Sequence, residues 1–79
     1  METIYTILFT ASHMEPLLFA ALSRSKLASK VRRHINELII DDPSLGEPLG
    51  QYVVLEQASG WLCEQYGYQF EITVHSEDI

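Results

Sequence analysis

The chain has 79 residues, a net charge of -6 and a single cysteine, so it has room for one small domain and cannot form an internal disulfide. Hydrophobic residues make up 47% and charged residues 20%, a composition typical of folded globular domains that excludes a disordered chain. No apolar run approaches the roughly 18 to 20 residues of a membrane span, and the acidic N-terminus lacks the basic start of a signal peptide. We therefore expect a cytoplasmic protein, with residues 1–79 forming a single small α+β domain.

A strand is the first element that the sequence predicts, over residues 3–10. β-branched and aromatic residues dominate this segment, as they do in strands generally. Tyr5, Ile7 and Phe9 alternate onto one face, while Ile4 and Leu8 contribute to the other. We therefore expect a strand whose two faces are both at least partly covered.

Helical structure is predicted next, from Ser12 to about Ile40. Ser12 and Glu15 have the S-x-x-E spacing of a capping box, and Pro16 falls in the first turn, where its missing amide hydrogen has no intrahelical partner to lose. Apolar residues then recur at three- and four-residue spacing: Leu17, Ala21, Ala28, Val31, Ile35 and Leu38. The polar stretch 23–25 interrupts this stripe, so one long helix and two helices meeting near Ser23 both fit, and we favour two.

The second half of the chain begins with a loop over residues 41–50, which holds two prolines and two glycines. Residues 51–66 fit two structures. Residues 52–55 look like a strand, yet apolar and small residues recur at helical spacing up to Tyr66, and Gly67 fits a helix C-cap. We predict a helix over residues 51–66.

The last predicted element is a strand, in which apolar and polar residues alternate. Its apolar face, which we expect to belong to the core, consists of Tyr68, Phe70, Ile72 and Val74. The resulting order is strand, one or two helices, loop, helix, strand. Because an isolated two-stranded sheet is marginally stable, either the segment around Tyr52 supplies a third strand or a homodimer completes the sheet.

Basic residues are confined to one window of ten positions and consist of Arg24, Lys26, Lys30, Arg32 and Arg33. On a helix, part of this set shares a face with Glu37, so the simplest interpretation is a solvated surface with an ion pair between Arg33 and Glu37. The alternative is a basic patch that binds phosphates, although the net charge of -6 repels nucleic acid at long range.

The eleven acidic residues are spread over the rest of the chain, where they either keep the protein soluble or attract a basic partner. Trp61 belongs to an aromatic cluster around the last helix and strand, and the glycine before it suggests close approach by another element or subunit. The candidate partner-binding residues are Glu47, Glu56, Glu64, Glu71 and Trp61.

Catalytic and metal-binding patterns are weak. His34, Glu37 and Asp41 could line one helical face as metal ligands, but the carboxylates are better explained as partners of nearby basic residues. Cys63 could act as a nucleophile with His13 or His75, although buried structural cysteines are the usual case. Nucleotide-binding and hydrolase signatures are absent from the sequence. We expect no enzyme activity, no metal and no cofactor.

By its small size, its acidity and its lack of catalytic groups, the sequence resembles the broad class of small phage or mobile-element inhibitors, of which anti-CRISPR proteins are one. This resemblance implies a non-enzymatic module that inhibits or regulates a larger, nucleic-acid-handling protein assembly by occupying a charged surface. The alternative is a dimeric regulator that binds nucleic acid through the basic helix at residues 24–33.

Overall fold

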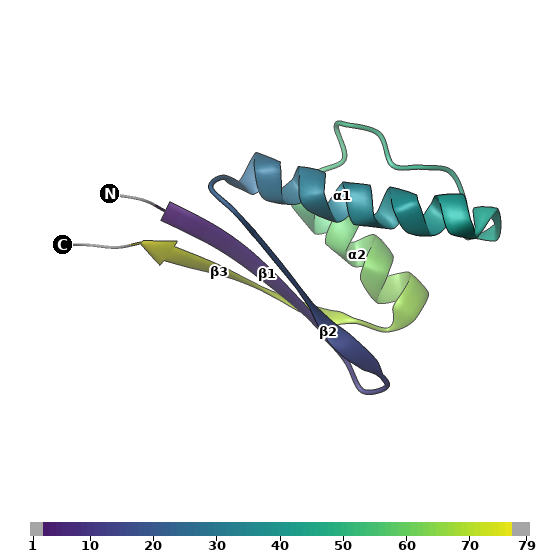
Figure 1. Ribbon diagram of the computed structural model, residues 1–79, viewed down its shortest axis with the longest axis horizontal. Helices are drawn as coiled ribbons and strands as arrows, with labels where there is room; N and C mark the ends of the chain where they lie inside the picture. Colours follow the sequence, from purple (N-terminus) through teal and green to yellow (C-terminus); the bar gives the residue numbers. More distant parts are fainter. Residues whose placement is uncertain (1–2, 77–79) are drawn as a thin grey trace.

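A computed structural model describes residues 3–76, which form three strands, two α-helices and one short 3-10 turn. In chain order these are β1 (Thr3–Ala11), β2 (Met14–Ala21), α1 (Arg24–Asp41), η1 (Pro43–Leu45), α2 (Leu55–Tyr66) and β3 (Gln69–Ser76). The strands form one antiparallel sheet in the order β2-β1-β3, and both helices lie on the same side of it (Figure 1). The α+β class predicted from the sequence is confirmed.

The prediction of a helix starting at Ser12 is wrong, because residues 12 and 13 form a two-residue hairpin turn and β2 follows at Met14. Along β2, Leu17 and Phe19 turn toward the helices while Leu18 points away, which is the period of two of a strand. Pro16 lacks an amide hydrogen, and an edge strand tolerates that loss. The segment is so rich in apolar residues that it also satisfies helical spacing, and pairing with β1 decides between the two.

A single helix, α1, replaces the two helices that we favoured. Ser23 does not mark a bend but caps the start of α1, since its hydroxyl accepts a hydrogen bond from the amide of Lys26 at 3.2 Å. The predicted end of the helix near Ile40 is confirmed, as α1 ends at Asp41. The side of α1 that faces the sheet and α2 carries its buried residues, Leu27, Ala28, Val31, Ile35 and Ile39.

The predicted helix after the loop is confirmed from Leu55 onward, but residues 51–54 form a turn and an extended stretch instead. Gly67 is the predicted C-cap: its φ of 73° lies in the left-handed region, and its amide donates to the carbonyl of Cys63 at 2.9 Å. The segment around Tyr52 does not supply the third strand. β2 supplies it, because the hairpin after β1 places an apolar segment directly beside that strand.

β3 confirms the last predicted strand, but only part of its apolar face is buried. Tyr68, just before β3, is buried and Ile72 is half-buried, whereas Phe70 is 39% and Val74 53% exposed. The reason is position in the sheet. β3 lies at an edge, and its C-terminal half extends past α2 (Figure 1), so the helices cover β1 more completely than β3.

Candidate functional site

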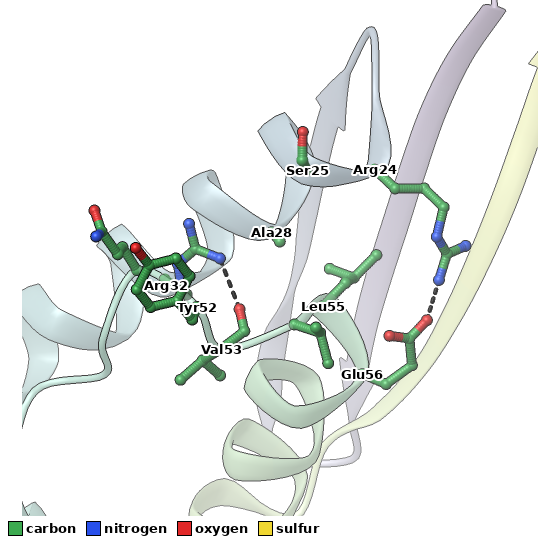
Figure 2. A pocket seen from close by; sticks show the side chains of 10 residues that line it. Arg24, Ser25, Ala28, Arg32, Tyr52, Val53, Leu55 and Glu56 are labelled. Carbon is green, nitrogen blue, oxygen red and sulfur yellow. Dashed lines mark hydrogen bonds and ion pairs between the residues drawn. The ribbon is translucent and has the colours of Figure 1, made fainter.

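A cavity of about 340 Å³ lies where the start of α1 meets the start of α2. Figure 2 shows that the segment just before α2 runs along one side of it, with Val53 next to the guanidinium of Arg32. That guanidinium donates a hydrogen bond to the carbonyl of Val53 at 2.6 Å. Arg24 forms an ion pair with Glu56, which joins the first turns of the two helices. The cavity is therefore bordered by two arginines that both have partners within the chain.

Residues 49–54, which we call the crossing segment, are held against α1 by two further hydrogen bonds. The side chain of Asn36 donates to the carbonyl of Leu49 at 3.2 Å and accepts from its amide at 2.7 Å. An asparagine amide can satisfy a backbone donor and a backbone acceptor at once, so one side chain takes the place of a strand neighbour. The crossing segment is therefore ordered by side chains of α1, although Tyr52 and Val54 remain exposed.

Asn36→Ala is expected to loosen the crossing segment and to lower the free energy of unfolding by about 1 to 3 kcal/mol, because the part-buried amide and carbonyl of Leu49 lose their partners. Hydrogen exchange at the Leu49 amide should rise together with the loss of stability. Glu37→Ala is the matched control, since this neighbouring side chain is exposed and forms no hydrogen bond or ion pair with residues 3–76. Equal protection of Leu49 in Asn36→Ala and in the wild type would contradict the assigned role.

The lining of the cavity combines apolar and polar residues. Within residues 3–76, every buried side-chain nitrogen or oxygen has a hydrogen-bond partner. The same residues hold no group of three or more side chains placed to bind a metal. The apolar part of the lining includes Ala28, Val53 and Leu55, and the polar part includes Ser25, Gln51 and Tyr52 beside the two engaged arginines. This arrangement can accept an apolar side chain.

The basic residues of α1 divide into two groups. Arg24 and Arg32 are engaged at the cavity, and the ammonium of Lys30 donates to the carbonyl of Ala20 on β2 at 2.5 Å. Lys26 and Arg33 are exposed, and their side chains form no hydrogen bond or ion pair with the described residues. The expected ion pair between Arg33 and Glu37 is therefore wrong. Most of the predicted basic patch serves to join α1 to other elements.

The candidate acidic residues behave differently from the basic ones. Glu47 lies in the loop after η1, Glu64 near the end of α2 and Glu71 on β3. All three are exposed, and none forms a hydrogen bond or ion pair with residues 3–76. Glu56 is the exception because it is paired with Arg24. The structure does not bring the four together, since they stand on three elements and on both sides of the sheet.

Trp61 is half-buried against the core, with its ring 6.2 Å from that of Tyr66. The prediction of close approach at Gly60 is wrong, because a Cβ built there would have no atom within 4 Å apart from its chain neighbours and its own helix backbone. Nothing else packs tightly against that position. Trp61 therefore acts in the structure as a core aromatic of α2, as aromatic residues in small domains usually do.

The histidines and the cysteine do not assemble into a site. The ring of His34 packs edge-on against Phe19, with 5.6 Å between the ring centres. His75 lies on β3, 3.2 Å from the hydroxyl of Thr6. Partial burial raises the pKa of the Cys63 thiol, which disfavours the reactive thiolate, and neither His13 nor His75 hydrogen-bonds to it.

The side of the sheet that faces away from the helices, which we call the outer face, carries exposed apolar residues that the sequence did not reveal as a surface. Leu8 on β1 lies directly opposite Leu18 on β2, and Ile4 follows on the same side of β1. All three are exposed, Leu18 to 66%. On the other side of β1, Leu8 lies opposite Glu71 of β3. The only signal in the sequence was the uninterrupted apolar run at 17–21, because in a strand successive residues of such a run point to opposite sides of the sheet.

Comparisons with known proteins found no matching family model, no matching curated protein and no matching solved structure. Among the described residues, neither helix combines the length and the apolar character needed to cross a membrane. Function must therefore be argued from the charges and surfaces of this chain.

Proposed function

We propose that this protein is a non-enzymatic, acidic interaction module of the cytoplasm, which binds a basic surface on a larger protein and inhibits or regulates that protein by occupying the surface. The observation that carries the proposal is the unequal engagement of its charges. Three of the five basic side chains are tied to other parts of the chain, while Glu47, Glu64 and Glu71 form no contact of this kind with the described residues.

An approaching molecule meets more carboxylates without a partner among the described residues than cations without one. With a net charge of -6, the molecule has a negative field, and the engaged cations are held close to backbone carbonyls or to a carboxylate. Such a field accelerates the approach of a positively charged partner even when the acidic residues do not form one patch, because steering depends on the summed charge. The same field opposes nucleic acid, so Lys26 and Arg33 are a poor basis for phosphate binding.

The contact itself is assigned to the outer face. Its adjacent leucines, Leu8 and Leu18, present the apolar centre that protein interfaces need, and Glu71 supplies a carboxylate at its border. The partner that fits this arrangement has an apolar patch surrounded by lysine or arginine. A nucleic-acid-handling assembly would offer such a surface in the groove where it holds phosphates.

The test uses a photo-crosslinking residue at position 18 to capture the partner from a lysate of the source cells, followed by binding measurements with the purified partner. Leu18→Asp should weaken binding by about 30-fold, as expected for a residue at the centre of an interface. Ile40→Asp is the matched control, since Ile40 is an equally exposed aliphatic residue, 71% exposed, on α1. If both variants bind the purified partner as the wild type does, the outer face is not the contact.

Charge is tested separately from contact. Replacing Glu47, Glu64 and Glu71 by lysine should slow association with the purified partner by about tenfold or more at low salt, and the difference should shrink as salt screens the charges. Glu56→Gln changes the net charge by one instead of six, so it should change the association rate much less. Capture of nucleic acid instead of protein, with loss of binding in a Lys26→Glu, Arg33→Glu variant, would replace this proposal with the nucleic-acid one.

A further inference from the structure

The two edges of the sheet differ in how well they are protected against pairing with another strand. Along β2, Pro16 has no amide hydrogen to donate, the register with β1 shifts between Phe9 and Ala11, and Lys30 already hydrogen-bonds to the carbonyl of Ala20. Proline, lysine and irregular pairing are the devices by which natural sheets block their edges. β3 pairs with β1 on one side without a register shift over the whole of Gln69–Ser76, and its eight residues contain no proline and no lysine.

The exposed apolar side chains of β3 lie beside this unprotected edge. Phe70 and Val74, both facing the helix side of the sheet, keep much of their surface in solvent, and Ile72 between them is half-buried. The helices cover them only in part because β3 is an edge strand, and its C-terminal half, which holds Val74, runs past α2 (Figure 1). A further strand added at β3 would bury these side chains against its own, whereas on the helix side of β2 Leu17 and Phe19 are already half-buried and Ala21 is buried.

We propose that β3 pairs with β3 of a second copy of this chain, antiparallel and about a two-fold axis that passes midway between the two copies of Ile72. The sequence of the strand is self-complementary about this residue. The axis places Ile72 opposite Ile72 of the second copy and Phe70 opposite Val74, twice, so that six apolar side chains form one continuous row. Aromatic and β-branched residues are favourable cross-strand neighbours. The two sheets become one sheet of six strands with all four helices on the same side.

The position of the Glu71 carboxylate also favours the register in which Ile72 lies opposite Ile72. An axis between the two copies of Glu71 would place the two Glu71 carboxylates directly opposite each other, and like charges in that position are unfavourable. An axis between the two copies of Thr73 would place Phe70 opposite Ser76 and leave the apolar row incomplete. With the axis at Ile72, Glu71 lies opposite Thr73, whose hydroxyl is a suitable donor for a carboxylate. A hydrophobic pattern fixes strand register wherever one face is apolar, and here it agrees with the charges.

This dimer does not depend on the proposed function, and salt separates the two. Two chains that each carry a charge of -6 repel one another, so screening strengthens the dimer while it weakens the attraction to a basic partner. An eight-residue strand pair buries less surface than a permanent interface. We therefore expect a dimer with a dissociation constant on the order of micromolar, which sedimentation equilibrium can resolve.

The first test compares two exposed residues on different strands. Wild-type protein should move from a 9.0 kDa monomer toward twice that mass as its concentration rises to the high micromolar range, and more readily at high salt. Val74→Lys, which places a charge at the edge, should raise the dissociation constant at least 30-fold, while Leu18→Lys on the outer face should change it less than threefold. A monomer at every concentration and salt level, or equal effects of the two variants, overturns the proposal.

The second test reads the register from disulfide formation and does not rely on the lysine variant. In a Cys63→Ser background, Ile72→Cys brings two thiols across the axis, where opposed strand residues are close enough to form a disulfide. Mild oxidation should convert most of this variant to a covalent dimer, whereas Val74→Cys, which faces Phe70 of the second copy, should remain largely monomeric. Crosslinking of Val74→Cys without that of Ile72→Cys overturns the assigned pairing.

Discussion

Phe9→Ala is expected to remove a large part of the free energy of unfolding. Phe9 is 0% exposed at the centre of β1, and its ring lies about 6 Å from the rings of Phe19, Tyr68 and Phe70. Truncating a buried phenylalanine costs about 3 to 5 kcal/mol, and the lost aromatic pairs add to this. A domain of this size has a total stability of roughly 4 to 12 kcal/mol, so one substitution removes much of it.

The matched control for Phe9 is the residue directly opposite it in the sheet, Phe70. Phe70→Ala should cost only about 1 kcal/mol in the monomer, because more than a third of the side chain is already in solvent. Urea unfolding followed by the fluorescence of Trp61, the single tryptophan, measures both variants. Equal losses at the two positions would mean that the helices cover β3 as fully as β1, contrary to the structure.

Ile35→Ala is expected to lower the free energy of unfolding by about 2 to 5 kcal/mol. Ile35 lies fully buried in the middle of α1, on the side that faces the sheet and α2, so truncation leaves a cavity where three elements meet. The midpoint of urea unfolding should fall sharply, in proportion to the lost free energy.

Ile40→Ala makes the same chemical change on the same helix at an exposed position. Its effect should lie within about 0.5 kcal/mol of zero, since little surface is lost and alanine has the higher helix propensity. The pair therefore tests which side of α1 faces the core while keeping the residue type constant. A larger loss at Ile40 than at Ile35 would reverse the assigned orientation of the helix.

Local patterns in the sequence were sufficient for several elements. Alternating residues predicted β1 and β3, and Gly67 marked the end of α2 because a left-handed C-cap favours glycine. The end of α1 also followed from its loss of helical spacing before Pro43. In each case the signal lies within a few neighbouring residues, so it requires no knowledge of what packs against them.

Residues 12–21 show where local patterns fail. The capping-box spacing of Ser12 and Glu15 and the spacing of the aliphatic residues both favoured a helix, yet the segment pairs with β1 across a two-residue turn. A short, dense apolar run satisfies periods of two and of about four equally well. A partner strand lies outside any such window, and the outer face of the sheet was missed for the same reason.

The sequence by itself determined the α+β class, the confinement of the basic residues to one helix and the net charge of -6. Only the tertiary structure decided which of those charges are engaged, because Arg24 meets Glu56 across 32 positions and Arg32 meets Val53 across 21. It also decided that Phe9 is core while Phe70 is an edge residue, although both stand on the predicted apolar faces of their strands. Burial and pairing depend on which elements become neighbours, and that is a property of the whole fold.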